Sequence, residues 1–249
     1  MKIFPKNVQT QCLYNNELDL SQLANLYQTD KGTADAATLP WSKAYPTHKC
    51  WHYTEVYEKY MSPKRNAPID MLEIGICDRR FPYASVKMWL SYFEYPNLFA
   101  MDNFWGNSLN EKLEDVSLLN DLGTTFIYGD QGSFDDWDAL ATAYPAKFDF
   151  VVEDGSHWPN HMMISLWKSI GVIKQGGYYF MEDIQNPLVS RGWFKYDNAL
   201  IAQELLETLA TKKLHSSFLN DTQNQQVQDS YELVDLVLDP HKVQYLAVF

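Results

Sequence analysis

Carboxylates and a histidine recur close together between residues 150 and 185 of the chain. Asp154, Glu182 and Asp183 supply hard oxygen donors, the ligands that Mg²⁺, Mn²⁺ or Ca²⁺ prefer. Brought together, these carboxylates would repel one another unless a cation held them. His157 follows soon after Asp154, and histidine is the side chain best suited to take up a proton near neutral pH. The residues predict a divalent-metal site with a general base beside it.

A second arrangement of the same segment stays open. Asp154, His157 and His161 form a set of two histidines and one carboxylate, which is a known ligand set for iron. It would leave Glu182 and Asp183 without a role. Tightly bound iron or zinc, rather than exchangeable magnesium, would support this arrangement.

The elements that must position these residues follow a regular alternation. Short apolar runs predict strands at 69–76, 98–102, 124–128, 148–153 and 178–181. Helical spacing follows at 83–93, 133–144, 160–173 and 198–211, with Ser133 as an N-cap and Gly176-Gly177 closing the third of these helices. The segments 231–238 and 243–249 predict an antiparallel hairpin. The pattern predicts a doubly wound, mostly parallel α/β sheet of seven strands, with this C-terminal hairpin at its edge.

Polar residues follow nearly every expected strand. Ligands of such sheets bind beyond the carboxyl ends of the strands, so these residues are the ones to inspect. Asp102 ends the second strand, where an acidic side chain can accept hydrogen bonds from both ribose hydroxyls of a nucleoside. Glu73 and Gly75 end the first strand, and Asp130 and Gln131 follow the third.

The composition excludes several classes of protein. Among 249 residues, 20 Lys+Arg stand against 32 Asp+Glu, for a net charge of −12. A general nucleic-acid binder or an anionic-membrane binder needs clustered cations instead. The 46% hydrophobic and 15% aromatic content excludes a disordered chain. No signal peptide or membrane span is readable, and Cys12, Cys50 and Cys77 form no disulfide framework, so a cytoplasmic location is expected.

The motifs resemble those of the metal-dependent sugar O-methyltransferases of macrolide pathways, the macrocin and mycinamicin type. These are class I, Rossmann-like enzymes that use S-adenosylmethionine (SAM). The resemblance spans residues 18–185 and rests on six segments: LANLYQTDKGT, HYTEVYEKY, LEIGI, KMWLSYF, VVEDGSHWPNH and GGYYFMEDIQ. A polar, Pro-bearing stretch at residues 61–68 marks a shift in composition. It separates residues 1–66, expected to form a small helical extension, or lid, that contributes to the site, from residues 67–249, expected to form the SAM-binding domain.

The resemblance also implies roles for matching residues. Asp154, Glu182 and Asp183 would bind Mg²⁺, or another divalent cation such as Mn²⁺, and His157 would be the catalytic base beside Asp154. Residues of several motifs would bind the cofactor. Glu73 and Gly75 would lie against SAM, Asp102 would bind its ribose, and Asp130 and Gln131 would lie near its adenine. Lys31, in the segment 29–32, and Tyr53, in the segment 52–53, would fold over the cofactor or substrate.

The loop after the first strand departs from the class I pattern. Class I enzymes usually carry several glycines there, whereas residues 75–81 contain only Gly75. Fewer glycines hinder the approach of the backbone to the methionine portion of SAM. Arg79 and Arg80 could instead face an anionic substrate or a subunit partner.

The expected reaction is methyl transfer from SAM to a sugar hydroxyl. The acceptor is a small molecule: a nucleotide-activated sugar, a surface or capsular glycan precursor, or a glycosylated natural product. The aromatic and cationic segment 190–196 is a candidate for binding it. A catechol- or phenol-type metal-dependent O-methyltransferase stays an alternative, as does a catalytically silent SAM-fold interaction module. The other expected partners are further copies of the chain in a homo-oligomer (dimer or tetramer), with neither nucleic acid nor a membrane.

Overall fold

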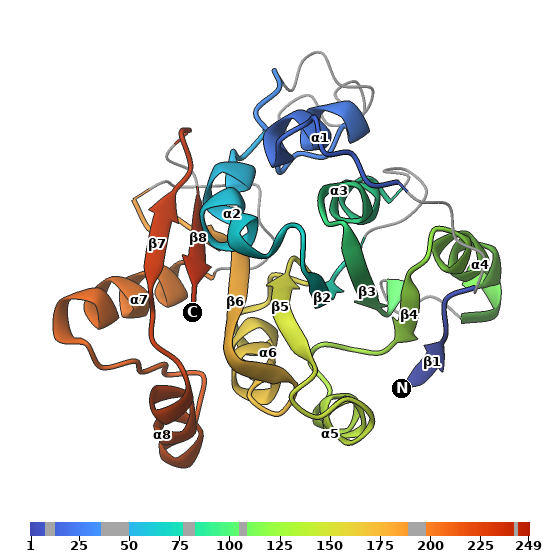
Figure 1. Cartoon of the computed structure of the whole chain (residues 1–249). Coiled ribbons are helices and arrows are strands. Elements are labelled where there is room, and N and C mark those ends of the chain that lie inside the picture. The colour runs from blue at the N-terminus through green and yellow to red at the C-terminus, as the bar shows by residue number, and fades with distance from the viewer. Residues whose placement is uncertain (8–12, 36–49, 77–82, 105–108, 189–197, 242–243) are drawn as a thin grey trace. The chain divides into compact units, whose positions relative to one another are not determined.

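The computed structural model describes seven stretches of the chain, drawn in colour in Figure 1: residues 1–7, 13–35, 50–76, 83–104, 109–188, 198–241 and 244–249. They form two compact units. The N-terminal unit comprises Lys2–Met71 and Ile76–Tyr128, and the C-terminal unit comprises Met1, Leu72–Gly75 and Gly129–Phe249. Several residues discussed above lie outside the described stretches: Cys12, Cys77, Arg79, Arg80 and the segment 190–196.

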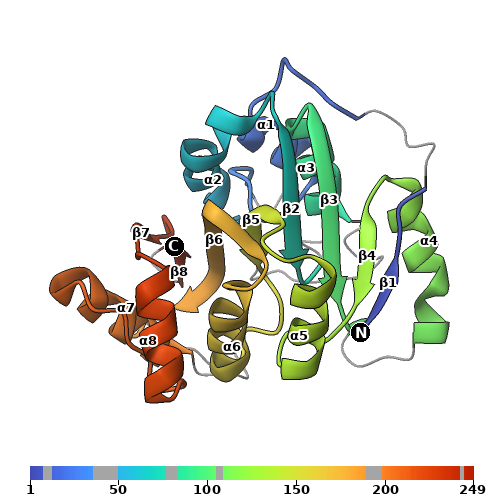
Figure 2. The same ribbon diagram turned by 60° about the horizontal axis from the view of Figure 1, so that its bottom comes forward.

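The N-terminal unit is built on strands in the order β1-β4-β3-β2. Its strands are β1 (Lys2–Phe4), the first part of β2 (Pro68–Ile74), β3 (Tyr95–Asp102) and β4 (Thr125–Tyr128). β3 and β4 are parallel, and β1 is antiparallel to β4. The helices are α1 (Leu20–Tyr27), α2 (Tyr53–Met61), η3 (Ser62–Lys64), α3 (Ala84–Tyr92), η5 (Leu109–Lys112) and α4 (Leu113–Asp121). Helix α3 packs against β3, and α1 packs against both α3 and α2 (Figure 2).

The C-terminal unit contains the end of β2 and four further strands, in the order β2-β5-β6-β8-β7. These are β5 (Phe148–Glu153), β6 (Ile173–Gln185), β7 (Asp235–Leu238) and β8 (Gln244–Val248). β5 and β6 are parallel, whereas β8 is antiparallel to both β6 and β7. The helices are α5 (Phe134–Ala143), α6 (Pro159–Ser169), α7 (Ala199–Thr211) and α8 (Asp221–Ser230). Figure 2 shows α6 beside β5 and β6, with which it is in contact.

Continuous burial identifies β5 as a central strand. Each of its residues is buried, and Phe148, Phe150, Val151 and Val152 are fully inaccessible. A parallel strand covered on both faces needs such an apolar run, because neither face meets water. The run ends in Glu153, so the strand passes from the core directly into the polar residues of the candidate site.

The expected α/β class with its C-terminal antiparallel hairpin is confirmed. Ser133 is confirmed as the N-cap of α5, since its Oγ accepts a hydrogen bond from the backbone N–H of Asp136 at 3.3 Å. The described residues contain eight strands instead of seven, because the short segment Lys2–Phe4 pairs with β4. Among these residues no helix is both long and apolar enough to cross a membrane.

One helix boundary differs from the sequence expectation. Helix α6 ends at Ser169, and Gly176-Gly177, expected to close it, lie inside β6. The physical reason is the turn at Gly171–Val172, whose N–H groups bond to Lys168 and Ser169 carbonyls and bring Ile173 into register with Phe148. The division into an extension at residues 1–66 and a SAM-binding domain at residues 67–249, and the lid function of the extension, stay predictions.

Candidate metal and base site

Three elements of the C-terminal unit carry the candidate site. Asp154 follows β5 directly, and its backbone N–H bonds to the Ile74 carbonyl at 2.9 Å. His157 lies between β5 and α6, and Asp183 lies near the end of β6. Because β5 and β6 are parallel, with Glu153 opposite Met181, their carboxyl ends meet at one edge.

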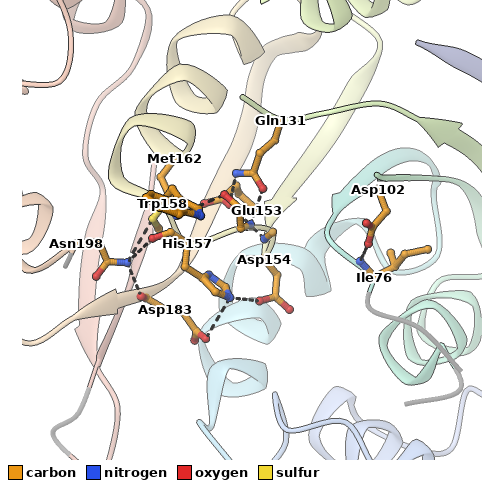
Figure 3. A network of polar contacts seen from close by, with 12 residues as sticks. Ile76, Asp102, Gln131, Glu153, Asp154, His157, Trp158, Met162, Asp183 and Asn198 are labelled. Carbon is orange, nitrogen blue, oxygen red and sulfur yellow. Dashed lines mark hydrogen bonds and ion pairs between the residues drawn. The ribbon is translucent and has the colours of Figure 1, made fainter. Parts of the chain in front are cut away.

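The side chains of Asp154, His157 and Asp183 converge (Figure 3). His157 Nε2 lies 3.9 Å from Asp154 Oδ1 and 3.8 Å from Asp183 Oδ2, and one donor atom of each residue lies within 4.8 Å of the others. All three side chains are partly buried, between 13% and 26% exposed. His157 Nδ1 is buried and has no hydrogen-bond partner among the described residues. Nε2 is therefore the nitrogen that faces the carboxylates.

The backbone at two of these residues is strained. His157 has φ of 57° and Asp183 has φ of 58°, in the left-handed region. That conformation costs a residue other than glycine roughly 1–2 kcal/mol. At Asp183 it accompanies a register shift between β6 and β8, from Met181 to Ile184. Such irregularities re-aim a side chain, and here they turn Asp183 toward His157.

The other two candidate ligands are placed differently. Glu182 is 1% exposed and is not one of the three residues whose donor atoms converge, so its role as a ligand stays a prediction. His161 Nδ1 bonds to Ser156 Oγ at 3.0 Å. Its ring lies against Gly132, where a Cβ would come within 2.5 Å of Nε2. This arrangement favours the carboxylate site over the one built on His157 and His161.

Gln131 holds the segment that carries Asp154 and His157. Its Nε2 donates to Glu153 Oε1 at 2.8 Å, and its Oε1 accepts from the Ser156 N–H at 2.6 Å (Figure 3). The side chain is 7% exposed. The structure thus gives Gln131 a role in fixing this segment, and its contact with adenine stays a prediction.

Glu153, the last residue of β5 and the neighbour of Asp154 in the chain, carries a fully buried carboxyl group. Burial raises the pKa of Glu153, although the neighbouring His157 and the hydrogen bond from Gln131 act in the opposite direction. Its Oε1 also accepts from the Gly155 N–H at 3.2 Å, whereas Oε2 has no hydrogen-bond partner among the described residues. The folded protein therefore binds a proton at Glu153 more tightly than the unfolded chain does.

Glu153→Gln is expected to stabilise the protein increasingly as the pH rises. Above the pKa of an unfolded glutamate, about 4.3, the unfolded wild type releases its proton first, so wild-type stability falls with pH. Glutamine cannot titrate and keeps the acceptor oxygen. Urea unfolding between pH 4 and 8 should show the difference in unfolding free energy growing in favour of the variant. The exposed Glu232→Gln serves as the control, and a difference that stays constant or shrinks would contradict the interpretation.

Gly75 lets the end of β2 approach the Asp154 segment. It has φ of 80°, and an added Cβ would lie 2.1 Å from the Asp154 carbonyl oxygen and 2.5 Å from Gly155 Cα. Glu73, two residues earlier, is completely buried. Glycine is thus required at position 75 because the backbone of Asp154 and Gly155 lies too close for a side chain. The contacts of Glu73 and Gly75 with SAM stay predictions.

Two predicted nucleoside-binding aspartates organise their own loops. In the N-terminal unit, the carboxylate of Asp102 accepts a hydrogen bond from the N–H of Ile76 at 2.9 Å (Figure 3) and another from the N–H of Phe104 at 2.6 Å. In the C-terminal unit, Asp130 Oδ1 accepts from the Gly132 N–H at 2.7 Å. The contacts of these aspartates with ribose and adenine stay predictions.

The two N-terminal motifs lie against each other. The backbone N–H groups of Trp51, His52 and Thr54 bond to the carbonyls of Asp30, Gly32 and Lys31, at 2.7, 3.1 and 3.1 Å. Lys31 is 1% exposed, and Tyr53 is 2% exposed. The pairing joins the segments 29–32 and 52–53 into one local structure, and their contact with cofactor or substrate stays a prediction.

The fold is that of a class I SAM-dependent methyltransferase. A solved structure of the methyltransferase MycE from the mycinamycin pathway, in complex with Mg, SAH and mycinamycin VI, matches with a TM-score of 0.60 at 23% identity, over 93% of this chain and 54% of that one. No family model matches the chain.

Two curated relatives are sugar O-methyltransferases by name. The 8-demethyl-8-(2-methoxy-alpha-L-rhamnosyl)-tetracenomycin-C 3'-O-methyltransferase of Streptomyces olivaceus is 31% identical over 140 residues, which are 54% of this chain and 33% of the relative. The mycinamicin VI 2''-O-methyltransferase of Micromonospora griseorubida is 28% identical over 169 residues, 67% of this chain and 36% of the relative. The resemblance expected from the motifs is confirmed, and the chain spans about a third of the length of these relatives.

Two residues that contact the site were not among those predicted: Glu153, which bonds to Gln131, and Asn198, whose Nδ2 donates to the carbonyls of His157 and Asp183. Glu153 appears in the sequence only as the last residue of an apolar strand, and Asn198 only as the first residue of an expected helix. No short-range pattern marks either of them, because their partners lie in other elements.

Proposed function

We propose that the chain is a SAM-dependent O-methyltransferase that methylates a sugar hydroxyl of a glycosylated natural product. The observation that carries the proposal is the convergence of His157 with Asp154 and Asp183 at the carboxyl ends of β5 and β6. The relatives support the acceptor class, since their names specify methylation of rhamnosyl tetracenomycin and of mycinamicin VI.

The donor set fits a divalent cation. Asp154 and Asp183 offer carboxylate oxygens close together, and Glu182 is the further ligand proposed from the sequence. When bound, the cation lowers the pKa of the acceptor hydroxyl, and SAM supplies the methyl group. The MycE structure, which contains Mg and SAH, supports this cofactor pair.

His157 is proposed to accept the hydroxyl proton at Nε2. That atom lies 3.8 and 3.9 Å from two carboxylates, which stabilise the imidazolium that forms. Gln131 fixes the segment that carries Asp154 and His157, so that the base stays beside the ligands. This pre-organisation supplies part of the rate, because it removes the cost of orienting the groups during the reaction.

The proposal is tested by incubating the purified chain with SAM, Mg²⁺ and a panel of glycosylated natural products, nucleotide sugars, simple glycosides and catechols. The expected result is a mass gain of one methyl on a glycoside, lost with EDTA and restored by Mg²⁺ or Mn²⁺. Asp183→Asn should weaken metal binding and raise the Mg²⁺ concentration needed for half-maximal activity.

Other outcomes would overturn parts of the proposal. Methyl transfer to catechols alone would identify a phenol-type O-methyltransferase. Undiminished activity in EDTA would show that the reaction does not depend on a metal ion. No SAM binding at millimolar concentration would favour a catalytically silent module. Nucleotide sugars are in the panel as alternative acceptors, and sedimentation of the chain tests the expected homo-oligomer.

A further inference from the structure

Asn198 makes an unusual set of contacts just before α7. Its Nδ2 donates to the Asp183 carbonyl at 3.0 Å and to the His157 carbonyl at 3.3 Å, and lies 3.4 Å from Met162 Sδ. Its Oδ1 accepts from the Gln185 N–H at 2.8 Å. The residue is 1% exposed, and Figure 3 shows it between the backbones of His157 and Asp183.

These two carbonyls belong to the two strained residues of the candidate site. His157 and Asp183 both have left-handed backbones. Such conformations persist only where the surroundings over-determine them. One buried amide bonded to both carbonyls supplies that constraint, and it ties the two residues to each other.

We propose that Asn198 is a positioning residue that holds His157 and Asp183 in the arrangement the reaction requires. The catalytic meaning of this inference rests on the proposed function, whereas the constraint itself does not. Since Asn198 contacts only the backbones of the two residues, it acts through them.

A simple helix-capping role does not account for these contacts. Asn198 occupies the N-cap position of α7, where asparagine usually accepts a hydrogen bond from the first turn of the helix. Its side chain makes no such bond. Asparagine also combines two N–H donors and one acceptor on a short side chain, and all three functions are used here.

The test compares Asn198→Asp with a matched control, Asn224→Asp. Aspartate keeps the oxygen that accepts from Gln185 and removes both donors. Asn224 in α8 is 6% exposed, donates to the carbonyls of Ser216 and Leu219 at 2.9 and 3.0 Å, and accepts from the Ser216 N–H at 2.7 Å. It therefore loses the same kind of contacts, but none that involve the candidate site.

Two measurements are made on both variants. In Asn198→Asp, hydrogen–deuterium exchange of the peptides 153–158 and 181–186 should accelerate together, by about tenfold or more, because local opening becomes easier. The kcat should fall by about 10²-fold, as expected for a misplaced catalytic group, with the KM for SAM nearly unchanged. Asn224→Asp should change neither exchange in these peptides nor kcat.

Unchanged exchange, acceleration in only one of the two peptides, or the same effects in Asn224→Asp would overturn the inference. If Asn198→Asp does not fold, Asn198→Ser takes its place, with Asn224→Ser as its control. Serine adds no charge and is too short to keep the bonds to the two carbonyls or to the Gln185 N–H. Hydrogen–deuterium exchange can be measured without turnover. An inactive wild type would therefore contradict the proposed function, while the exchange of the two peptides would still decide whether Asn198 holds His157 and Asp183 in place.

Discussion

His157→Asn is expected to lower kcat by about 10²–10⁴-fold, the usual contribution of a positioned general base. His157 Nε2 lies between the carboxylates of Asp154 and Asp183, where it can take up a proton and remain stabilised as a cation. Asparagine suits the test because it tolerates the left-handed backbone at this position better than alanine does. Turnover is measured by methyl transfer, and SAM binding by calorimetry.

Metal affinity separates two roles for His157. A base can be removed with little loss of Mg²⁺ or Mn²⁺ binding, whereas loss of a ligand weakens it strongly. SAM affinity should stay within about twofold if the loss lies in the chemical step. The exposed His215→Gln is the control and should keep full turnover. Activity of His157→Asn within a few-fold of wild type would remove His157 from the mechanism.

Gly75→Ala is expected to lower the free energy of unfolding by about 3–5 kcal/mol, combining backbone strain with a steric conflict. Its Cβ would lie 2.1 Å from the Asp154 carbonyl oxygen, and the atoms it meets belong to the backbone, which cannot swing away. The end of β2 or the Asp154 segment has to shift. Metal binding should therefore weaken in any fraction that still folds. Urea unfolding and metal titration measure the two effects.

Gly176→Ala is the matched control for the steric part. Gly176 has φ of 75°, close to the 80° of Gly75, but an added Cβ would meet nothing within 4 Å. Gly176→Ala should lower the free energy of unfolding by only about 1–2 kcal/mol, because alanine is strained in a left-handed backbone conformation. Equal losses in the two variants would show that the contact with Asp154 contributes nothing.

Local patterns predicted most elements of the fold. The apolar run of β5 and the Ser133 cap of α5 depend on residues close in sequence, and both were found where expected. The short strand β1 was missed, because three residues carry no readable period and form a strand only by pairing with β4. Helix α8 was also missed, because it is polar and has too few apolar residues to show a helical period. The Asn220–Gln223 capping box at its start is the local signal that could have found it.

By itself, the sequence determined the fold class, the resemblance to sugar O-methyltransferases and the residue types of the candidate site. The tertiary structure decided which of these residues meet. It brought Asp154, His157 and Asp183 together, and it placed Asn198 on two carbonyls that are 41 and 15 residues away along the chain. The physical reason is range: side-chain periodicity reports each element's own neighbours, whereas strained backbones and shared hydrogen bonds exist only once distant elements have packed.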